Sequence, residues 1–323
     1  MKNAIKNLLL ITPKSFYLFH HFLAKEFEKK GFAVTIANDE YPENFIGKIL
    51  GKFNFNIGRS ITKNKICNDF LKGKKYDLIL IIKGRGMSTE LIGEMKKNSK
   101  RIVGYTFDSI KYHNSPLRWW KSLNSFYTFD FRDSKNYNMS LLELFSSMPE
   151  GEPGIFERDI DLSVISRNHS DRLVYLDNAL KALPVKNLFI YIFEKDIATF
   201  VINFFRNPLL YIKYRKFIHF KSLDYKLFGN IMKRSVFTLD YAHPDQSGLT
   251  MRSFEAASVG TKLITNNSYI FDSTFYTKND ALLFPLNGDK IQLLEGYYNL
   301  KELPFTIRKR TISDFVENII AEG

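Results

Sequence analysis

The sequence predicts an α/β protein of two domains, each with a parallel β-sheet covered by helices. Short β-rich apolar runs alternate with stretches of helical periodicity in both halves of the chain. A chain of 323 residues with 45% hydrophobic residues can also bury more than one core. The segment Ser146–Gly154, rich in proline and glycine, is the predicted linker. We therefore expect one domain at residues 1–150 and another at 151–323.

The first half is expected to open with a strand, a helix and a second strand, at Leu8–Thr12, Phe19–Lys30 and Ala33–Ala37. The near-continuous apolar run Tyr76–Ile82 is typical of a strand that is buried on both faces. The other expected elements of this half are a helix capped by Ser88 or Thr89 that ends near Lys97, and strands at Arg101–Thr106 and Ser125–Phe129.

The second half repeats this alternation. Strands are expected at Leu162–Ile165, Leu188–Phe193, Ser235–Leu239 and Lys262–Thr265, and helices at Asp171–Leu183 and Thr250–Ser258, the last of which stops at Gly260. Because parallel sheets of this kind bind ligands at the carboxyl ends of their strands, we expect a ligand cleft between the two domains.

The segment from His243 to Asn267 carries the strongest functional signal. It is expected to place a polar loop and a helix N-terminus after a strand, where free backbone N–H groups and the helix dipole can bind an anion. Arg252, in the first helical turn, can add a bidentate phosphate contact, and Glu255 could accept both hydroxyls of a ribose. His243 could contact a donor phosphate or act as an acid, or it could equally be a turn residue.

This segment resembles the nucleotide-sugar signature of GT-B glycosyltransferases, E-A-x-x-x-G-x-x-[LV]-[IV]-[TS], which is matched from Glu255 to Thr265. The preceding string QSGLTMRSFEA is similar to a group of bacterial lipopolysaccharide and capsular polysaccharide transferases. The resemblance implies the GT-B fold of two Rossmann-like domains, with the donor in the second. It also implies a donor site that contains Gln246, Ser247, Gly248, Thr250, Arg252 and Glu255.

The resemblance implies that Glu255 binds the ribose. Many retaining GT-B enzymes carry a second glutamate eight residues earlier, where this chain has Ser247. The resemblance therefore leaves the stereochemistry of the transfer open.

The general base is expected in the first half, because the acceptor is normally offered by the domain opposite the donor. Asp108 is the favoured residue, since it follows a strand at its carboxyl end. A helix cap or a loop ion pair would explain each candidate equally well. The other candidates are Asp130, Asp133, His20 and His21.

Two further basic residues, Lys83 and Arg85, lie in the loop that follows the strand Tyr76–Ile82. They could bind an acceptor phosphate, or they could be surface charges. The sequence Asp159-Ile160-Asp161 has the letters of a metal-binding D-x-D motif, but it precedes a strand instead of ending one, so we treat the match as chance. Basic residues and a helix terminus would then stabilise the leaving diphosphate without a metal or another cofactor.

The net charge of +13 indicates anionic partners. Nucleic acid is not expected, because the sequence has no zinc finger, RNA-recognition signature or clear helix-turn-helix. The aromatic and basic stretch Phe200–Phe220 is expected to be a core helix with a basic surface; the sharper alternative is a patch that touches anionic lipid. The lone Cys67 and the lack of a signal-peptide pattern indicate a cytoplasmic protein, with peripheral membrane contact left open.

Together these observations predict a metal-independent glycosyltransferase that moves a sugar from a nucleotide sugar to a growing surface glycan or a lipid-linked acceptor. Two alternatives stay open. One is a sugar-nucleotide epimerase of the same fold, and the other is a non-catalytic, two-domain ligand-binding protein.

Overall fold

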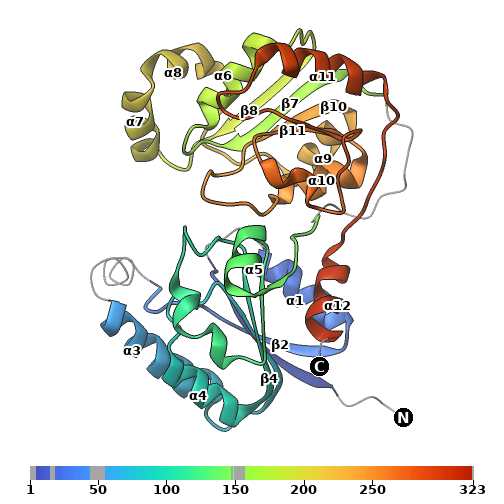
Figure 1. Ribbon diagram of the computed structural model, residues 1–323. Helices are drawn as coiled ribbons and strands as arrows, with labels where there is room; N and C mark the ends of the chain where they lie inside the picture. Colours follow the sequence, from blue (N-terminus) through green and yellow to red (C-terminus); the bar gives the residue numbers. More distant parts are fainter. Residues whose placement is uncertain (1–4, 15–18, 44–54, 147, 149–156, 322–323) are drawn as a thin grey trace. The chain divides into compact units, whose positions relative to one another are not determined.

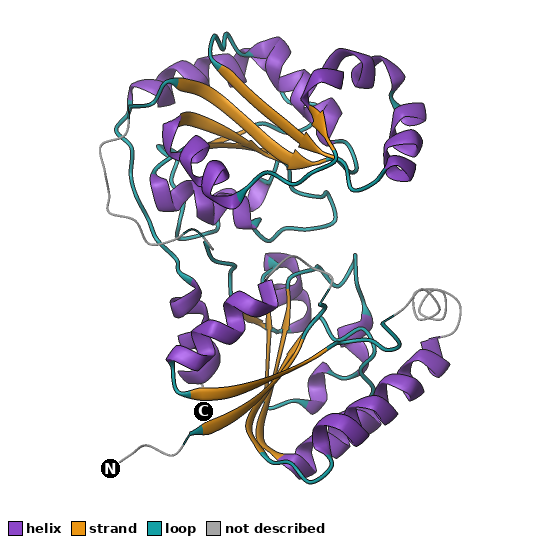
Figure 2. Ribbon diagram, turned by 180° about the vertical axis from the view of Figure 1, so that it is seen from behind, coloured by secondary structure: helices purple, strands orange, loops and turns teal. Residues whose placement is uncertain are grey.

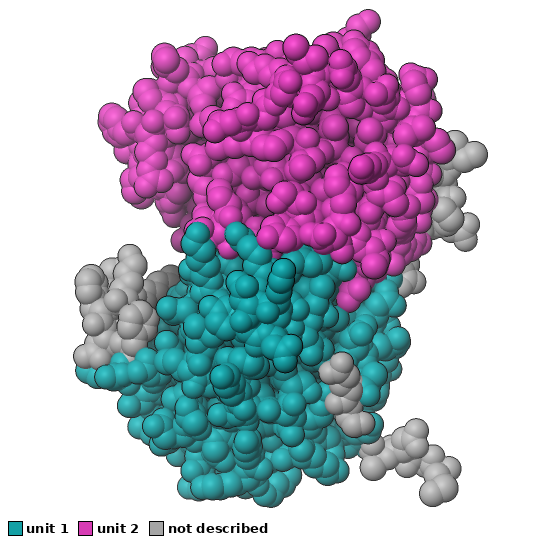
Figure 3. Space-filling view, in the orientation of Figure 1, with its two compact units in different colours: residues 1–144, 311–323 teal, residues 145–310 magenta. Residues whose placement is uncertain are grey.

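The computed structural model describes residues 5–14, 19–43, 55–146, 148 and 157–321. The chain divides into two compact units, each with its own parallel six-stranded sheet and flanking helices (Figures 1 and 2). Unit 1 comprises residues 1–144 and 311–323, and unit 2 comprises residues 145–310 (Figure 3). Most of the predicted linker lies outside the described residues.

The sheet of unit 1 has the strand order β2-β1-β3-β4-β5-β6. The order reverses between β1 and β3, which makes this the topological switch point of the sheet. The strands are β1 (Lys6–Ile11), β2 (Phe32–Ala37), β3 (Tyr76–Ile82), β4 (Ser99–Thr106), β5 (Ser125–Thr128) and β6 (Ser140–Leu141). The main helices are α1 (Phe19–Lys29), α3 (Phe55–Ile66), α4 (Thr89–Asn98), α5 (Phe131–Tyr137) and α12 (Ile312–Ala321).

The sheet of unit 2 has the order β12-β11-β10-β7-β8-β9, with its switch point between β7 and β10. Numbered from β7, this is the strand order of a dinucleotide-binding Rossmann fold. The strands are β7 (Ile160–Arg167), β8 (Leu188–Phe193), β9 (Ile218–His219), β10 (Ser235–Asp240), β11 (Lys262–Thr265) and β12 (Ala281–Leu283). The helices are α6 (Arg172–Ala182), α7 (Ile197–Arg206), α8 (Pro208–Tyr214), α9 (Tyr225–Arg234), α10 (Met251–Val259) and α11 (Lys290–Glu302).

Each unit has its own hydrophobic core, built where the sheet meets its helices. In unit 1, Leu9 and Ile79 of the central strands pack with Ile92 of α4. In unit 2, Phe237 of β10 packs with Tyr297 of α11. Among the described residues, no helix has both the length and the apolar character that a bilayer crossing needs.

The predicted strands are all present, and the predicted ends of two helices are confirmed by their contacts. Ser88 caps α4, because its Oγ accepts a hydrogen bond from the backbone N–H of Leu91 at 3.3 Å. Gly260 ends α10 in the left-handed conformation, with φ 70°.

The last helix belongs to unit 1, which differs from the division at 150 and 151 expected from the sequence. Phe315 of α12 is fully buried and meets the ring of Tyr105 edge-on at 4.9 Å between centroids. The Arg101 guanidinium donates to the backbone oxygens of Ile319 and Ile320 at 3.0 and 3.1 Å. A cation thus satisfies the free carbonyls at the C-terminus of α12, an arrangement that the helix dipole favours.

Truncation of this anchor is expected to destabilise unit 1. Phe315→Ala should lower the free energy of unfolding by about 3–5 kcal/mol, the usual cost of removing a buried phenylalanine. Denaturant unfolding followed by circular dichroism measures this. The control is Asn318→Ala, on the exposed side of the same helix; equal stabilities of the two variants would contradict the packing described here.

Candidate functional site

The N-terminus of α10 lies at the switch point of unit 2. Thr250 is the N-cap residue, but its Oγ1 donates to Oδ2 of Asp240 at 2.8 Å and does not cap the first turn. Arg252 donates from Nη2 to the backbone oxygen of Ile165 at 2.8 Å. Since Asp240 ends β10 and Ile165 lies near the end of β7, both contacts hold α10 at the edge where Rossmann folds bind ligands.

Glu255 lies one helical turn further along α10 and is buried. Its Oε1 accepts a hydrogen bond from the hydroxyl of Tyr225 at 3.1 Å, and its Oε2 lies 4.0 Å from Nε of Arg252. The Arg252 guanidinium also stacks over the ring of Phe228, 4.4 Å from its centroid. The structure therefore brings two predicted donor residues together, and adds Tyr225, which the sequence analysis missed.

The loop before α10 is fixed mainly through its backbone. The N–H of Gln246 donates to the carbonyl of His243 at 2.9 Å and closes a turn. Ser247 and Gly248 are buried, and their carbonyl oxygens accept from Nδ2 of Asn267 at 3.0 and 3.2 Å. Asn267 follows β11, so it ties the loop to the next strand.

The ring of His243 is oriented by its own turn. Its Nδ1 accepts a hydrogen bond from the N–H of Asp245 at 3.2 Å. In the neutral ring the proton therefore sits on Nε2, which is a hydrogen-bond donor. A donor on the loop between β10 and α10 is suited to an anionic ligand.

The turn after β7 brings further basic residues to the same edge, and the sequence analysis missed them. Arg172 donates from Nη1 to the carbonyl of Arg167 at 3.0 Å and from Nη2 to that of Tyr241 at 3.4 Å, so it bridges the ends of β7 and β10. Partial loss of hydration, with the nearby Arg172 and Arg167 cations, lowers the pKa of His169. These residues could have been predicted from the position of this turn beside the switch point.

In unit 1, the predicted base and a predicted phosphate ligand form an ion pair. Nζ of Lys83 lies 2.5 Å from Oδ2 of Asp108, across the ends of β3 and β4. Lys83 and Gly84 are both left-handed, with φ 67° and 63°. A Cβ on Gly84 would lie 2.5 Å from the ring of Trp119, so this tight turn needs glycine there.

Arg85 contacts two acidic residues that follow β2. Its backbone N–H donates to Oδ2 of Asp39 at 3.1 Å, and its Nη1 lies 3.6 Å from Oε2 of Glu40. Burial raises the pKa of Asp39 to about 6, although the Arg85 N–H opposes this shift. Burial also raises the pKa of Glu40. The sequence analysis considered the aspartates after later strands, and the same rule applied to β2 would have found Asp39.

His113 is a further, half-buried group at this edge. Burial, and then the Lys83 and Arg85 cations, lower the pKa of His113 to about 4. Its Nε2 lies 2.5 Å from Oγ of Ser115. The imidazole is thus neutral near pH 7. Acidic, basic and imidazole groups therefore gather after β2, β3 and β4.

The other base candidates in unit 1 contact neighbouring residues of the same unit. Asp130 caps α5 by accepting from the N–H of Asp133 at 3.1 Å. Asp133 accepts from the N–H of Ile110 at 2.6 Å, and burial raises the pKa of Asp133 to about 6. His20 and His21 lie together on α1, with ring centroids 4.2 Å apart.

The two aspartates of the D-x-D string are paired with basic residues. Asp159 binds the guanidinium of Arg234, and Oδ1 of Asp161 lies 3.0 Å from Nζ of Lys301. In the part of the chain that the structure describes, no three His, Cys, Asp or Glu side chains gather in a way that could hold a metal ion.

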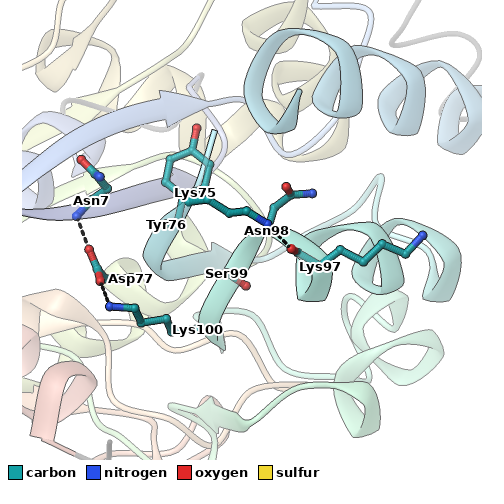
Figure 4. Close-up of a pocket in the computed structure, with 8 residues that line it drawn as sticks. All are labelled: Asn7, Lys75, Tyr76, Asp77, Lys97, Asn98, Ser99 and Lys100. Atoms are coloured by element: carbon teal, nitrogen blue, oxygen red, sulfur yellow. Dashed lines mark hydrogen bonds and ion pairs between the residues drawn. The ribbon is translucent and has the colours of Figure 1, made fainter. Parts of the chain in front are cut away.

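A pocket of about 370 Å³ lies at the opposite, amino edge of the unit 1 sheet (Figure 4). Oδ2 of Asp77 accepts from the N–H of Asn7, and its Oδ1 pairs with Nζ of Lys100, both at 2.7 Å. Nζ of Lys75 donates to the carbonyl of Lys97 at 2.7 Å. Since parallel sheets bind ligands at the other edge, we do not assign the donor or acceptor to this pocket.

The structure resembles known enzymes although the sequence does not: neither a protein-family model nor a curated protein sequence matches the chain. AviGT4, a glycosyltransferase involved in avilamycin A biosynthesis, has a TM-score of 0.61 and 8% identity, over 98% of this chain and 96% of that one. The lipopolysaccharide outer core galactosyltransferase WaaB has a TM-score of 0.59 and 10% identity, over 98% and 100%. The chain has the GT-B fold. The predicted fold class is thereby confirmed.

An enzyme of a different activity has a related structure. The UDP-GlcNAc 2-epimerase of Methanocaldococcus jannaschii has a TM-score of 0.52 and 10% identity, over 98% of this chain and 100% of that one. At such identities the likeness defines the fold, and the activity must be argued from the site.

The raised pKa of Asp39 has a consequence for stability. An aspartate whose pKa rises on folding favours the folded state below its unfolded pKa, 3.8, and this contribution is lost as the pH rises through about 6. Asp39→Asn should therefore raise the free energy of unfolding at about pH 7.5, by up to about 3 kcal/mol for a shift of this size, and have little effect near pH 4. Denaturant unfolding of both proteins at the two pH values tests this, and a pH-independent difference would contradict a raised pKa.

Proposed function

We propose that the chain is a glycosyltransferase that moves a sugar from a nucleotide-sugar donor to a hydroxyl of a growing surface glycan or a lipid-linked acceptor. The observation that supports this most directly is the placement of α10. Its N-terminus meets the ends of β7 and β10, and the buried Glu255 and the fixed Arg252 follow within two turns. This arrangement suits a ligand that joins an anion to a ribose.

We assign the donor to unit 2. Glu255 accepts hydrogen bonds from the ribose hydroxyls, and Tyr225 orients its carboxylate. The N-terminus of α10, with Gln246, Ser247, Gly248 and Thr250 in the preceding loop, lies beside the diphosphate. Arg252 and Arg172 stabilise the charge that grows on this diphosphate as the glycosidic bond breaks, with Nε2 of His243 as an added donor. No metal or other cofactor takes part in this proposal.

We assign the acceptor to unit 1. Lys83 and Arg85 bind an acceptor phosphate, and Asp108 is the general base. The ion pair of Lys83 with Asp108 suggests how the two roles combine. An acceptor phosphate competes with Asp108 for the ammonium group, and this releases the carboxylate to take the proton of the hydroxyl.

The reaction is a direct displacement. The acceptor oxygen forms a bond to the anomeric carbon, the bond from that carbon to the diphosphate oxygen breaks, and the nucleotide leaves with the electron pair. Asp108 receives the proton of the attacking hydroxyl. Such a reaction uses cytoplasmic nucleotide sugars, and we place the protein in the cytoplasm.

Epimerisation is the second candidate function, since an epimerase shares this fold. The two reactions differ in their dependence on acceptor. A transferase releases nucleotide in proportion to acceptor, whereas an epimerase converts one nucleotide sugar into another without it. A purely ligand-binding protein would bind the nucleotide and do neither.

The donor assignment is tested by Glu255→Ala. Loss of charge-assisted hydrogen bonds to the ribose should lower nucleotide affinity by about ten-fold or more in calorimetric titration.

Arg252→Ala should reduce turnover more than nucleotide affinity, because its partner charge develops in the transition state. The matched control is Glu295→Ala, an exposed glutamate of α11 in the same unit.

Circular dichroism verifies that each variant is folded. Because Glu255 also accepts a hydrogen bond from Tyr225, the milder Tyr225→Phe change separates loss of orientation from loss of the carboxylate. Unchanged nucleotide affinity in a folded Glu255→Ala protein would mean that this carboxylate is structural.

A further inference from the structure

Helix α7 presents an apolar surface to solvent. None of its residues is buried. Phe200 and Phe204 pack partly against the core of unit 2. On the adjoining side of the helix Ile197, Val201 and Phe205 are 71%, 43% and 77% exposed. Their spacing of four residues places them in one stripe along the helix.

Helix α8 extends this surface. Leu209 and Ile212 are 80% and 54% exposed, and Ile202 of α7 is 56% exposed. In both ribbon views α7 and α8 form the periphery of unit 2, beside its sheet (Figures 1 and 2). We call the six side chains the α7–α8 face: Ile197, Val201, Ile202, Phe205, Leu209 and Ile212.

The α7–α8 face is fixed in place by a buried polar cluster below it. Glu194 follows β8 and is fully buried. Its carboxylate accepts from Nδ2 of Asn168 at 2.7 Å, from Nδ2 of Asn203 in α7 at 3.4 Å, and from the hydroxyl of Tyr211 in α8. Both helices are thus tied to the ends of β7 and β8. Because these bonds hold both helices in place, the apolar side chains stay exposed in the folded unit.

Basic residues are frequent in the segment that carries this face, and one of them, Lys213, pairs with Asp177 of α6 at 2.5 Å. Between residues 195 and 221 the chain has six lysines and arginines and one acidic residue, Asp196. Asp196 caps α7 by accepting from the N–H of Thr199 at 2.7 Å. The basic side chains are all exposed: Lys195, Arg206, Lys213, Arg215, Lys216 and Lys221.

An apolar helical face with a basic rim is typical of helices that lie in the interface of an anionic bilayer. Anionic headgroups complement this rim. A second copy of this chain would bring the same rim and its own charge of +13, so charge opposes pairing through this face.

We propose that the α7–α8 face binds the surface of an anionic membrane, with its apolar side chains among the lipid tails and its basic rim at the headgroups. Within Phe200–Phe220, Tyr211 and Tyr214 join the core and the basic residues are exposed, as expected. The exposed side of α7, however, is largely apolar. This proposal does not depend on the proposed function. It extends that function, because a protein held at a membrane surface has access to a lipid-linked acceptor.

The experiment is sedimentation of the full chain with sucrose-loaded vesicles of phosphatidylcholine, with or without phosphatidylglycerol. The chain should bind the anionic vesicles, bind pure phosphatidylcholine much less, and dissociate as salt is added. The double variant Phe205→Ser, Leu209→Ser should lower the partition coefficient by about ten-fold or more, because both side chains leave the interface. The matched control is Ile291→Ser in α11, where the side chain is 67% exposed.

Three results would overturn the proposal. The first is equal partitioning of the double variant and the native chain, and the second is an equal loss in the Ile291→Ser control. The third is a dimer of the native chain, detected by light scattering, that the double variant dissociates; the face would then join two copies. All the substituted side chains are exposed, so the variants should fold, and thermal unfolding verifies this. Nucleotide titration tests the proposed function separately from membrane binding.

Discussion

The attachment of α10 to two neighbouring strands is the constraint on which the candidate donor site depends. Thr250 and Arg252 use their side chains to bind Asp240 and the backbone of Ile165, at the ends of β10 and β7. The hydroxyl of Thr250 makes no hydrogen bond to the first turn of α10. The helix dipole of α10 directs its positive end at the switch point, which is a physical basis of anion binding by Rossmann folds.

At the ligand edge of unit 1, ionisable side chains are held partly or fully away from water, which disfavours their charged forms. Asp39 is almost fully buried and has a raised pKa, and His113 at the same edge has a lowered pKa. Lys83 adopts a left-handed backbone that residues with a side chain rarely use. A fold selected for stability alone would remove these features, whereas ligand sites commonly retain them.

The sequence predicted the strands because buried parallel strands are continuous apolar runs, as Tyr76–Ile82 is. It also predicted α10, since its cap, its glycine stop and its flanking strands are all local signals. It could not place α12, because the burial of Phe315 against Tyr105 depends on contacts more than two hundred residues apart in the chain. The sequence analysis missed Arg172 and Asp39 for the same reason. They lie near the other site residues only because of the order of the strands in each sheet.

The central claim is that unit 2 binds the nucleotide part of an activated sugar. The most direct measurement is thermal unfolding of the native chain with UDP, GDP, CMP and dTDP in turn. The account predicts that one of these nucleotides stabilises the protein, by about 2.7 kcal/mol at a hundred times its dissociation constant, and that Arg172→Ala weakens this effect. If none of the four nucleotides raises the unfolding temperature even at millimolar concentration, the donor site described here is contradicted.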